Sequence, residues 1–374
     1  LGAPFFHYKI CSTFDSSPTV GSIGHATEIG MRVFQSQVVP MMVGAPALRR
    51  YVAYSNLFAR VDDETYRLDR HPTMSKHPIT PMTESDLRLH LAQQTDLPIG
   101  AMTLWHMEKE QPEVDAYFAR LMEEGAKIVL FDSINHAHLY MIGRLVWGMK
   151  NEHPVLLVGS SGFEYALRQY WIAEGIVPLM PPPAPVPPVK QLIVMSGSAA
   201  PATSAQITWA MNNGYAAIRL NSADLIDPDT ADAERERVTR EALMVLEQGK
   251  SVVLYSTHGS ADPAIAETKQ RMERLNLGDL HVGSLLGAQQ GRILKELLSV
   301  TRLRRAVVCG GDTCGYSAQQ LGIYALRAMM PFAPGAPLCR AYAEDPRFDG
   351  LEINLKAGQI GRPDFFEAIR TAVY

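Results

Sequence analysis

The chain has 374 residues, of which 47% are apolar and 20% charged, and its formal net charge is −4. This length exceeds what one hydrophobic core usually serves, so we expect two domains. The small negative charge gives no electrostatic basis for binding nucleic acid or an anionic membrane, and no apolar run approaches the length of a membrane span. Four cysteines without a CxxC pair predict free thiols in a reducing cytoplasm.

A polar loop comes almost at once, at residues 9–24, and it crowds lysine, hydroxyl and carboxylate side chains together. Lys9 could take the carboxylate of a small acid, while Ser12, Thr13 and Asp15 could take its hydroxyl groups. The alternative is a solvated loop without a ligand. Because a parallel-sheet domain seldom starts with such a loop, we expect this domain to lack its first strands.

Three apolar runs in the first half predict buried strands, at residues 37–46, 126–133 and 154–162. Asp132, at the end of the second run, is a candidate substrate ligand because strand-terminal acids often serve ligands. His136 and His138 follow it two positions apart, as on a strand face, and with no third ligand in view we predict no metal site.

Between the first two runs, residues 70–82 place two histidines, an arginine and a lysine among prolines. This segment is either a rigid ligand loop, with His77 as a candidate substrate contact, or a proline-stiffened connection. The next stretch, 83–95, predicts a helix with Thr83 as its N-cap.

The clearest boundary is a proline-rich segment, because six of the eight residues at 181–188 are proline. Proline fixes φ and removes a hydrogen-bond donor, so the segment predicts an extended, semi-rigid linker. We therefore expect a first domain at 1–180 and a second at 189–374.

The second domain alternates strand and helix patterns, which predicts an α/β fold with a mostly parallel, doubly covered sheet. The expected strands are 191–198, 215–220, 251–259, 305–313 and 351–361, and the expected helices are 202–214, 231–248, a stretch within 282–300, and one with apolar residues at helical spacing through 321–329.

Four turns after these strands carry glycine and hydroxyl residues, at 195–200, 256–260, 310–315 and 356–361. Ligands of open α/β sheets bind at the carboxyl ends of strands, and exposed amides at a helix start attract anions. Together the turns fit a phosphate or a nucleotide, although ordinary strand-to-helix turns use the same residues. The turn at 310–315 matches neither Walker A nor GxGxxG.

Six ordered motifs, "YKICSTFDSSPTVGSIG", "HPITPMTESDL", "VMSGS", "CGGDTCG", "APGAPL" and "GLEINLKAGQIG", resemble those of the four-carbon acid sugar kinase family. The resemblance implies two α/β domains, with the acid sugar on the first, ATP on the second and the active site in the cleft between them. It implies substrate contacts in the loop that holds Lys9 and Asp15. It also implies ATP contacts at the following residues: Ser196, Gly197, Ser198, Gly310, Gly311, Asp312, Thr313, Gly315 and Gly358.

The chain departs from the family pattern in two places. The Asp-Asp-x-Thr-Gly-Ala motif expected upstream of the lysine loop does not occur, and Cys314 stands where serine is common. The resemblance implies Mg²⁺ bridging the phosphates of ATP. Asp15 and Asp312 are the candidate catalytic carboxylates, and the sequence does not choose between them and the upstream acids.

We therefore expect a cytoplasmic kinase with two small-molecule partners, a sugar acid and ATP, and a possible homodimer. Two other classes stay open. One is a catalytically inactive protein that binds ATP and a sugar acid, and the other is an oxidoreductase with a nucleotide cofactor.

Overall fold

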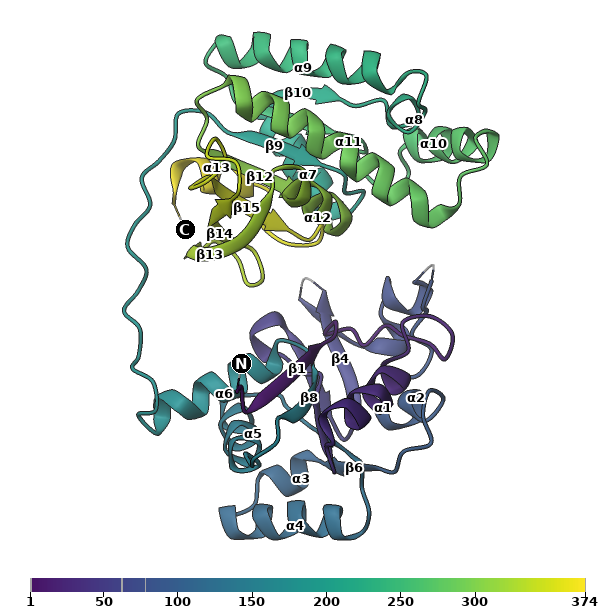
Figure 1. The fold of residues 1–374 in the computed structure, drawn as a ribbon, viewed down its shortest axis with the longest axis vertical. Helices are drawn as coiled ribbons and strands as arrows, with labels where there is room; N and C mark the ends of the chain where they lie inside the picture. Colours follow the sequence, from purple (N-terminus) through teal and green to yellow (C-terminus); the bar gives the residue numbers. More distant parts are fainter. Residues whose placement is uncertain (1, 62, 78, 374) are drawn as a thin grey trace. The chain divides into compact units, whose positions relative to one another are not determined.

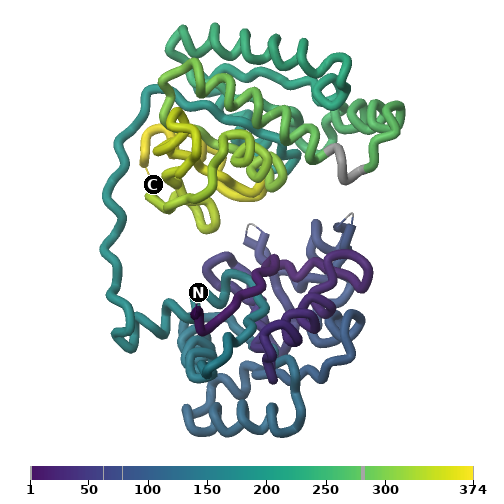
Figure 2. The backbone as a smooth tube through the Cα atoms, viewed as in Figure 1, coloured from purple at the N-terminus to yellow at the C-terminus, as the bar shows by residue number. Residues whose placement is uncertain are grey.

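The computed structural model describes residues 2–61, 63–77 and 79–373, and the chain divides into two compact units, Leu1–Met180 and Pro181–Tyr374 (Figure 1). Each unit has its own parallel sheet and its own helices, and one extended segment of chain connects the two (Figure 2). The predicted α/β class is confirmed.

Unit 1 is built on a five-stranded parallel sheet in the order β1-β8-β2-β7-β6. Its inner strands are buried on both faces, which explains their continuous apolar runs. One face packs against α4, α5 and α6, and the other packs against α1, α2 and a small second sheet. The elements are β1 (Phe5–Lys9), α1 (Ile23–Phe34), β2 (Val39–Met42), α2 (Leu87–Leu91), β6 (Ile99–Met102), α3 (Leu104–Met107), α4 (Gln111–Glu123), β7 (Ile128–Phe131), α5 (His136–Gly148), β8 (Val155–Gly159) and α6 (Gly162–Ala173).

The small antiparallel sheet of unit 1 is absent from the sequence prediction. It consists of β3 (Arg50–Ala53), β4 (Asn56–Val61) and β5 (Glu64–Arg67), flanked by short 3-10 helices η1 (Pro46–Leu48), η2 (Leu68–Arg70) and η3 (Met74–Lys76). The turn between β3 and β4 is Tyr54–Ser55, with φ of 49° and 65°. Such two-residue turns usually contain Asn or Gly, and the absence of both removed the hairpin signal.

Two local predictions in unit 1 are wrong. Helix α2 begins after Asp86, whose side chain accepts from the amide of Arg88, and not at Thr83. The residues before it are extended beside β4, where the amide of Leu57 donates to Ser85. His136 and His138 lie in the first turn of α5 and not on a strand, because Asn135 caps that helix through the amide of His138.

Unit 2 has a seven-stranded sheet in the order β10-β11-β9-β12-β15-β14-β13, of which the first five strands are parallel. Helices α9 and α11 pack on one face, and α7 and α13 on the other (Figure 1). The elements are β9 (Ile193–Ser196), α7 (Pro201–Asn212), β10 (Ala216–Arg219), α8 (Ser222–Leu225), α9 (Ala231–Glu247), β11 (Val252–Tyr255), α10 (Pro263–Arg274), α11 (Asp279–Val300), β12 (Arg305–Cys309), α12 (Gly311–Gln320), β13 (Ile323–Pro331), β14 (Pro337–Ala343), β15 (Glu352–Lys356) and α13 (Phe365–Thr371).

The prediction of a helix through residues 321–329 is also wrong. Helix α12 ends at Gln320, Gly322 takes a φ of 65°, and the chain turns into β13. This strand is the sheet's edge and pairs antiparallel with β14, a partner that local spacing does not reveal. Most side chains of β13 are exposed, so its apolar residues, although spaced as in a helix, do not form the buried face of a helix.

The proline-rich segment is anchored to unit 2 at its C-terminal end. Arg305, fully buried in β12, donates to the carbonyl of Pro187 at 2.8 Å and to Glu352 at 2.6 Å. The amide of Val189 donates to the carbonyl of Arg370 at 2.8 Å. The residues before Val186 are exposed, so the extended connection effectively ends there.

Candidate functional site

The carboxyl edge of the unit 2 sheet brings three of the predicted turns together. Ser196, Cys309 and Lys356, the last residues of β9, β12 and β15, are in register across the sheet. The amide of Gly197 donates to the carbonyl of Cys309, and the amide of Gly310 donates to that of Lys356, both at 3.0 Å. The SGS, GGDT and KAGQIG turns therefore leave neighbouring strands side by side.

Glycine is sterically required where these turns touch. A Cβ on Gly197 would stand 2.1 Å from the Thr313 hydroxyl, and one on Gly358 would stand 2.0 Å from the Ser198 hydroxyl. Gly310 has a φ of 111°, which other residues rarely adopt. The turns thus interlock, and a side chain on either of the first two glycines would push them apart.

Hydrogen bonds between buried side chains hold the SGS and GGDT turns in place. The Thr313 hydroxyl donates to Gln290 of α11 at 3.0 Å, and the amide group of Gln290 donates to the carbonyl of Ser196 at 3.4 Å. Both side chains are buried. The resemblance implied that Thr313 contacts ATP; its hydroxyl, through Gln290, also connects two of the turns. Gln290 carried no local sequence signal, because its partners lie on other elements.

Lys356 supports the third turn. Its ammonium donates to the Thr203 hydroxyl at 3.1 Å, and that hydroxyl donates to the carbonyl of Gly358 at 2.7 Å. The lysine is buried, which lowers its pKa, and the nearby thiols of Cys309 and Cys314 act in the opposite direction. The sequence indicated a lysine at this turn but not that it is enclosed.

Helix α12 begins at this edge without a side-chain cap, so its first amides are not satisfied by its N-cap residue, Gly310. Gly311 and Gly315 have open space where a Cβ would stand, and Asp312 is exposed in the first turn. Cys314 points inward instead, and burial raises its pKa to about 12, so it remains a neutral thiol. Exposed amides at a helix start suit an anion such as phosphate.

In unit 1, the loop after β1 lies at the carboxyl edge of its sheet. The Thr13 hydroxyl donates to the carboxylate of Asp15, and Thr13 is buried. Lys9 is exposed and Ser12 half-exposed, and neither side chain forms a hydrogen bond or ion pair within the described part of the chain. The predicted ligands Lys9, Ser12 and Asp15 therefore come together on one loop.

Distant residues hold this loop in place. Gln94, after α2, donates to the Ser16 hydroxyl at 2.9 Å, and its oxygen accepts from the amides of Ile23 and Gly24 at the start of α1. His90 lies 3.1 Å from the same hydroxyl. Gln94 therefore joins both ends of the loop, a role invisible in the sequence.

Asp132 has a structural role that the sequence did not reveal. Its carboxylate accepts from the amides of Tyr54 (2.5 Å), Ser55 (2.9 Å) and Leu104 (2.8 Å), and it is fully buried. Burial raises its pKa, although the three amides and the charge of Arg88 oppose this. Asp132 thereby fixes the left-handed turn of the β3–β4 hairpin at the sheet's carboxyl edge.

His77 is partly buried, and its Nδ1 accepts from the amide of Thr80 at 3.1 Å, within the loop at residues 70–82.

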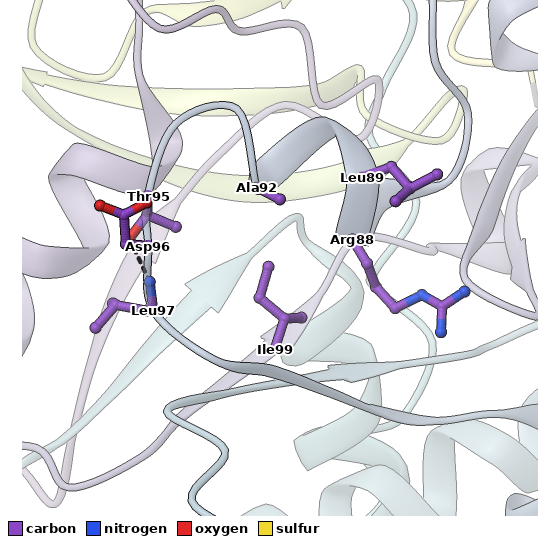
Figure 3. Close-up of a pocket in the computed structure, with 7 residues that line it drawn as sticks. All are labelled: Arg88, Leu89, Ala92, Thr95, Asp96, Leu97 and Ile99. Atoms are coloured by element: carbon purple, nitrogen blue, oxygen red, sulfur yellow. Dashed lines mark hydrogen bonds between the residues drawn. The ribbon is translucent and has the colours of Figure 1, made fainter.

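A separate hollow of about 350 Å³ lies between α2 and the start of β6 (Figure 3). Ile99, the first residue of β6, lines it, so it lies toward the amino edge of the sheet. It is therefore distinct from the loops at the carboxyl edge.

Two negative findings apply to the described residues. None of the helices there is both long and apolar enough to cross a membrane. No group of three or more His, Cys, Asp or Glu side chains could hold a metal ion.

Two protein-family models match successive parts of the chain. Residues 1–167 match the family model of a sugar-binding N-terminal domain, and residues 193–366 match that of a nucleotide-binding C-terminal domain. The chain belongs to the four-carbon acid sugar kinase family, which confirms the resemblance found in its motifs.

Two relatives illustrate the similarity. A 3-oxo-isoapionate kinase from Paraburkholderia graminis is 43% identical over 99% of this chain and 78% of the relative. A 3-oxo-tetronate kinase from Cupriavidus necator is 29% identical over 99% of this chain and 79% of the relative. The chain is therefore a sugar acid kinase.

Among solved structures, the chain resembles that of a putative tRNA synthase from Salmonella typhimurium LT2. The TM-score is 0.74 and the identity 24%, over 98% of this chain and 80% of the other. At this identity the likeness supports the fold alone.

Proposed function

We propose that the chain is an ATP-dependent kinase that phosphorylates a hydroxyl group of a 3-oxo sugar acid of the tetronate or isoapionate type. The observation that carries the ATP part is the interlocking of the three glycine turns at the start of α12. The sugar-acid part is supported by the loop of Lys9, Ser12 and Asp15 and by the relatives' activities.

Phosphoryl transfer depends more on positioning and charge neutralisation than on covalent chemistry. In this proposal, the uncapped amides at the start of α12, such as that of Gly311, hold the phosphates of ATP together with the helix dipole, and the turn of Gly197 and Ser198 packs beside them. The buried Lys356, fixed between Thr203 and the Gly358 turn, adds positive charge close beneath them. Ser196, Gly310, Asp312, Thr313 and Gly315 complete the proposed nucleotide-binding set.

Mg²⁺ usually keeps several waters and binds phosphates together with one or two carboxylates. The exposed carboxylate of Asp312, in the first turn of α12, fits that requirement without a dedicated protein cage. The ion would neutralise charge on the β- and γ-phosphates. Asp15 is the proposed acceptor of the hydroxyl proton, since it lies in the sugar-acid loop and already accepts from Thr13.

A coupled ADP-release assay tests the proposal. We expect ATP- and Mg²⁺-dependent ADP release with 3-oxo-isoapionate or 3-oxo-tetronate, and less or none with erythronate and threonate. An Asp15→Asn variant should keep ATP binding and lose turnover. If none of the acids in the panel causes ADP release although ATP binding is measurable, the proposed kinase activity is contradicted. The homodimer and the cytoplasmic location remain predictions. Light scattering, which measures the molar mass in solution, would test the homodimer.

A further inference from the structure

Arg50 lies at the carboxyl edge of the unit 1 sheet, close to the sugar-acid loop. It is the first residue of β3, and residues 43–49 connect it directly to the carboxyl end of β2. Its guanidinium is partly buried, and burial lowers its pKa, while the neighbouring Cys11 and Tyr51 oppose this shift. Cys11 belongs to the loop after β1, so the guanidinium and that loop are neighbours.

Hydrogen bonds fix one side of the guanidinium, whereas the other side forms none. Nη1 donates to the carbonyls of Leu48 (3.2 Å), Arg49 (3.2 Å) and Arg60 (3.4 Å). Nε is buried without any hydrogen-bond partner. Over the described residues, no carboxylate pairs with Arg50. The three carbonyls therefore hold the group in one orientation and leave its Nε–Nη2 edge unused.

The same edge binds carboxylates elsewhere in this chain. Nε and Nη2 of Arg67 both donate to Asp69, and the corresponding nitrogens of Arg88 donate to Asp86 at 3.1 and 2.7 Å. Those carboxylates raise the pKa of the arginines they bind. Arg50 has the geometry of such a fork but lacks the anion that would complete it.

We propose that Arg50 binds the carboxylate of the sugar acid through its Nε and Nη2 atoms and so determines the preference of the enzyme for acids. This inference rests on the proposed function. Lys9, exposed at the end of β1, contributes a second positive charge to the same anion. A primary amide offers one acceptor oxygen where a carboxylate offers two, so one of the two donors, Nε–H or Nη2–H, would face an NH2 group, which disfavours such ligands strongly.

The test compares an acid with its neutral amide. For the best acid of the panel and its primary amide, kcat/KM comes from ADP release and Kd from calorimetry with the intact chain. Wild type, Arg50→Gln, Arg50→Lys and the control Arg67→Gln are measured. Arg67 lies on β5 of the same small sheet and binds Asp69 instead of a ligand.

We expect the wild type to prefer the acid by about 100-fold or more, as a charge-assisted fork would give. Arg50→Gln should reduce that preference to about threefold, with the loss in KM rather than kcat, and Arg50→Lys should restore part of it because the charge remains. Arg67→Gln should keep the wild-type preference. Because Arg50 also holds three carbonyls, a purely structural role would weaken acid and amide equally.

The two proposals can fail separately. If the wild type turns over an acid and Arg50→Gln retains the acid preference, the role of Arg50 is wrong and the kinase proposal stands. If the wild type binds the acid in an Arg50-dependent way but releases no ADP, the role of Arg50 stands and the kinase proposal is wrong. Absence of any acid binding by the wild type would overturn the role of Arg50.

Discussion

The carboxyl edges of the two sheets are built by different means. In unit 2, three short turns leave neighbouring strands in register and touch through glycines and backbone amides. In unit 1, the edge depends on side chains from separate segments, namely Gln94 on the loop after β1, Asp132 on the β3–β4 turn and Arg50 beside them. A backbone-built site leaves local motifs in the sequence, whereas a side-chain-built site leaves isolated residues whose partners are far away.

The strongest test of the backbone-built edge is Gly197→Ala. The new Cβ would stand 2.1 Å from the Thr313 hydroxyl, so the SGS and GGDT turns must separate. We expect ATP affinity, measured by calorimetry, to fall about 100-fold or more, because misplaced phosphate contacts are costly. The matched control is Gly148→Ala in unit 1, which has open space at its Cβ and lies in α5. Near-normal ATP binding by Gly197→Ala would show that the turns do not need to interlock.

A side-chain-built edge should instead lose stability when one anchor is removed. Asp132→Ala leaves the amides of Tyr54, Ser55 and Leu104 without their acceptor, and we expect about 3 kcal/mol less stability in the transition of unit 1. Thermal and urea unfolding followed by circular dichroism would measure it. Ser55→Gly should act oppositely, by about 0.5–1 kcal/mol, because its φ of 65° favours glycine. An unchanged unfolding midpoint in Asp132→Ala would contradict the anchoring role.

The smallest effect is expected at Lys9, the exposed member of the sugar-acid loop. Lys9→Met removes a charge that is screened by solvent, so KM for the acid should rise about tenfold while kcat and ATP affinity stay near wild type. Steady-state kinetics at low and at 0.5 M salt would check this, since salt should weaken the wild type and not the variant. A larger effect than that of Arg50→Gln would reverse the order of importance given to the two cations.

The sequence predicted the parallel cores well, because buried strands such as β7, β8 and β12 are continuous apolar runs. It failed where pairing is long-range. The edge strand β13 looked helical, and the β3–β5 sheet was missed because its turn, Tyr54–Ser55, has no glycine or asparagine. At the candidate site, the glycine turns and the Lys9 loop were visible, while Gln290, Gln94 and Arg50 were not. Each of those three acts on residues of other segments.

By itself, then, the sequence determined the α/β class, the family and the glycine turns, because periodicity and backbone freedom are local properties of the chain. Only the tertiary structure decided that Thr313 and Lys356 form hydrogen bonds that support the turns, that Asp132 holds a hairpin, and that the Nε of Arg50 is buried without a partner. The physical reason is that a side chain's role depends on which donors and acceptors the fold brings within hydrogen-bond distance. Those partners lie far away in the sequence, so the residues next to the side chain do not identify them.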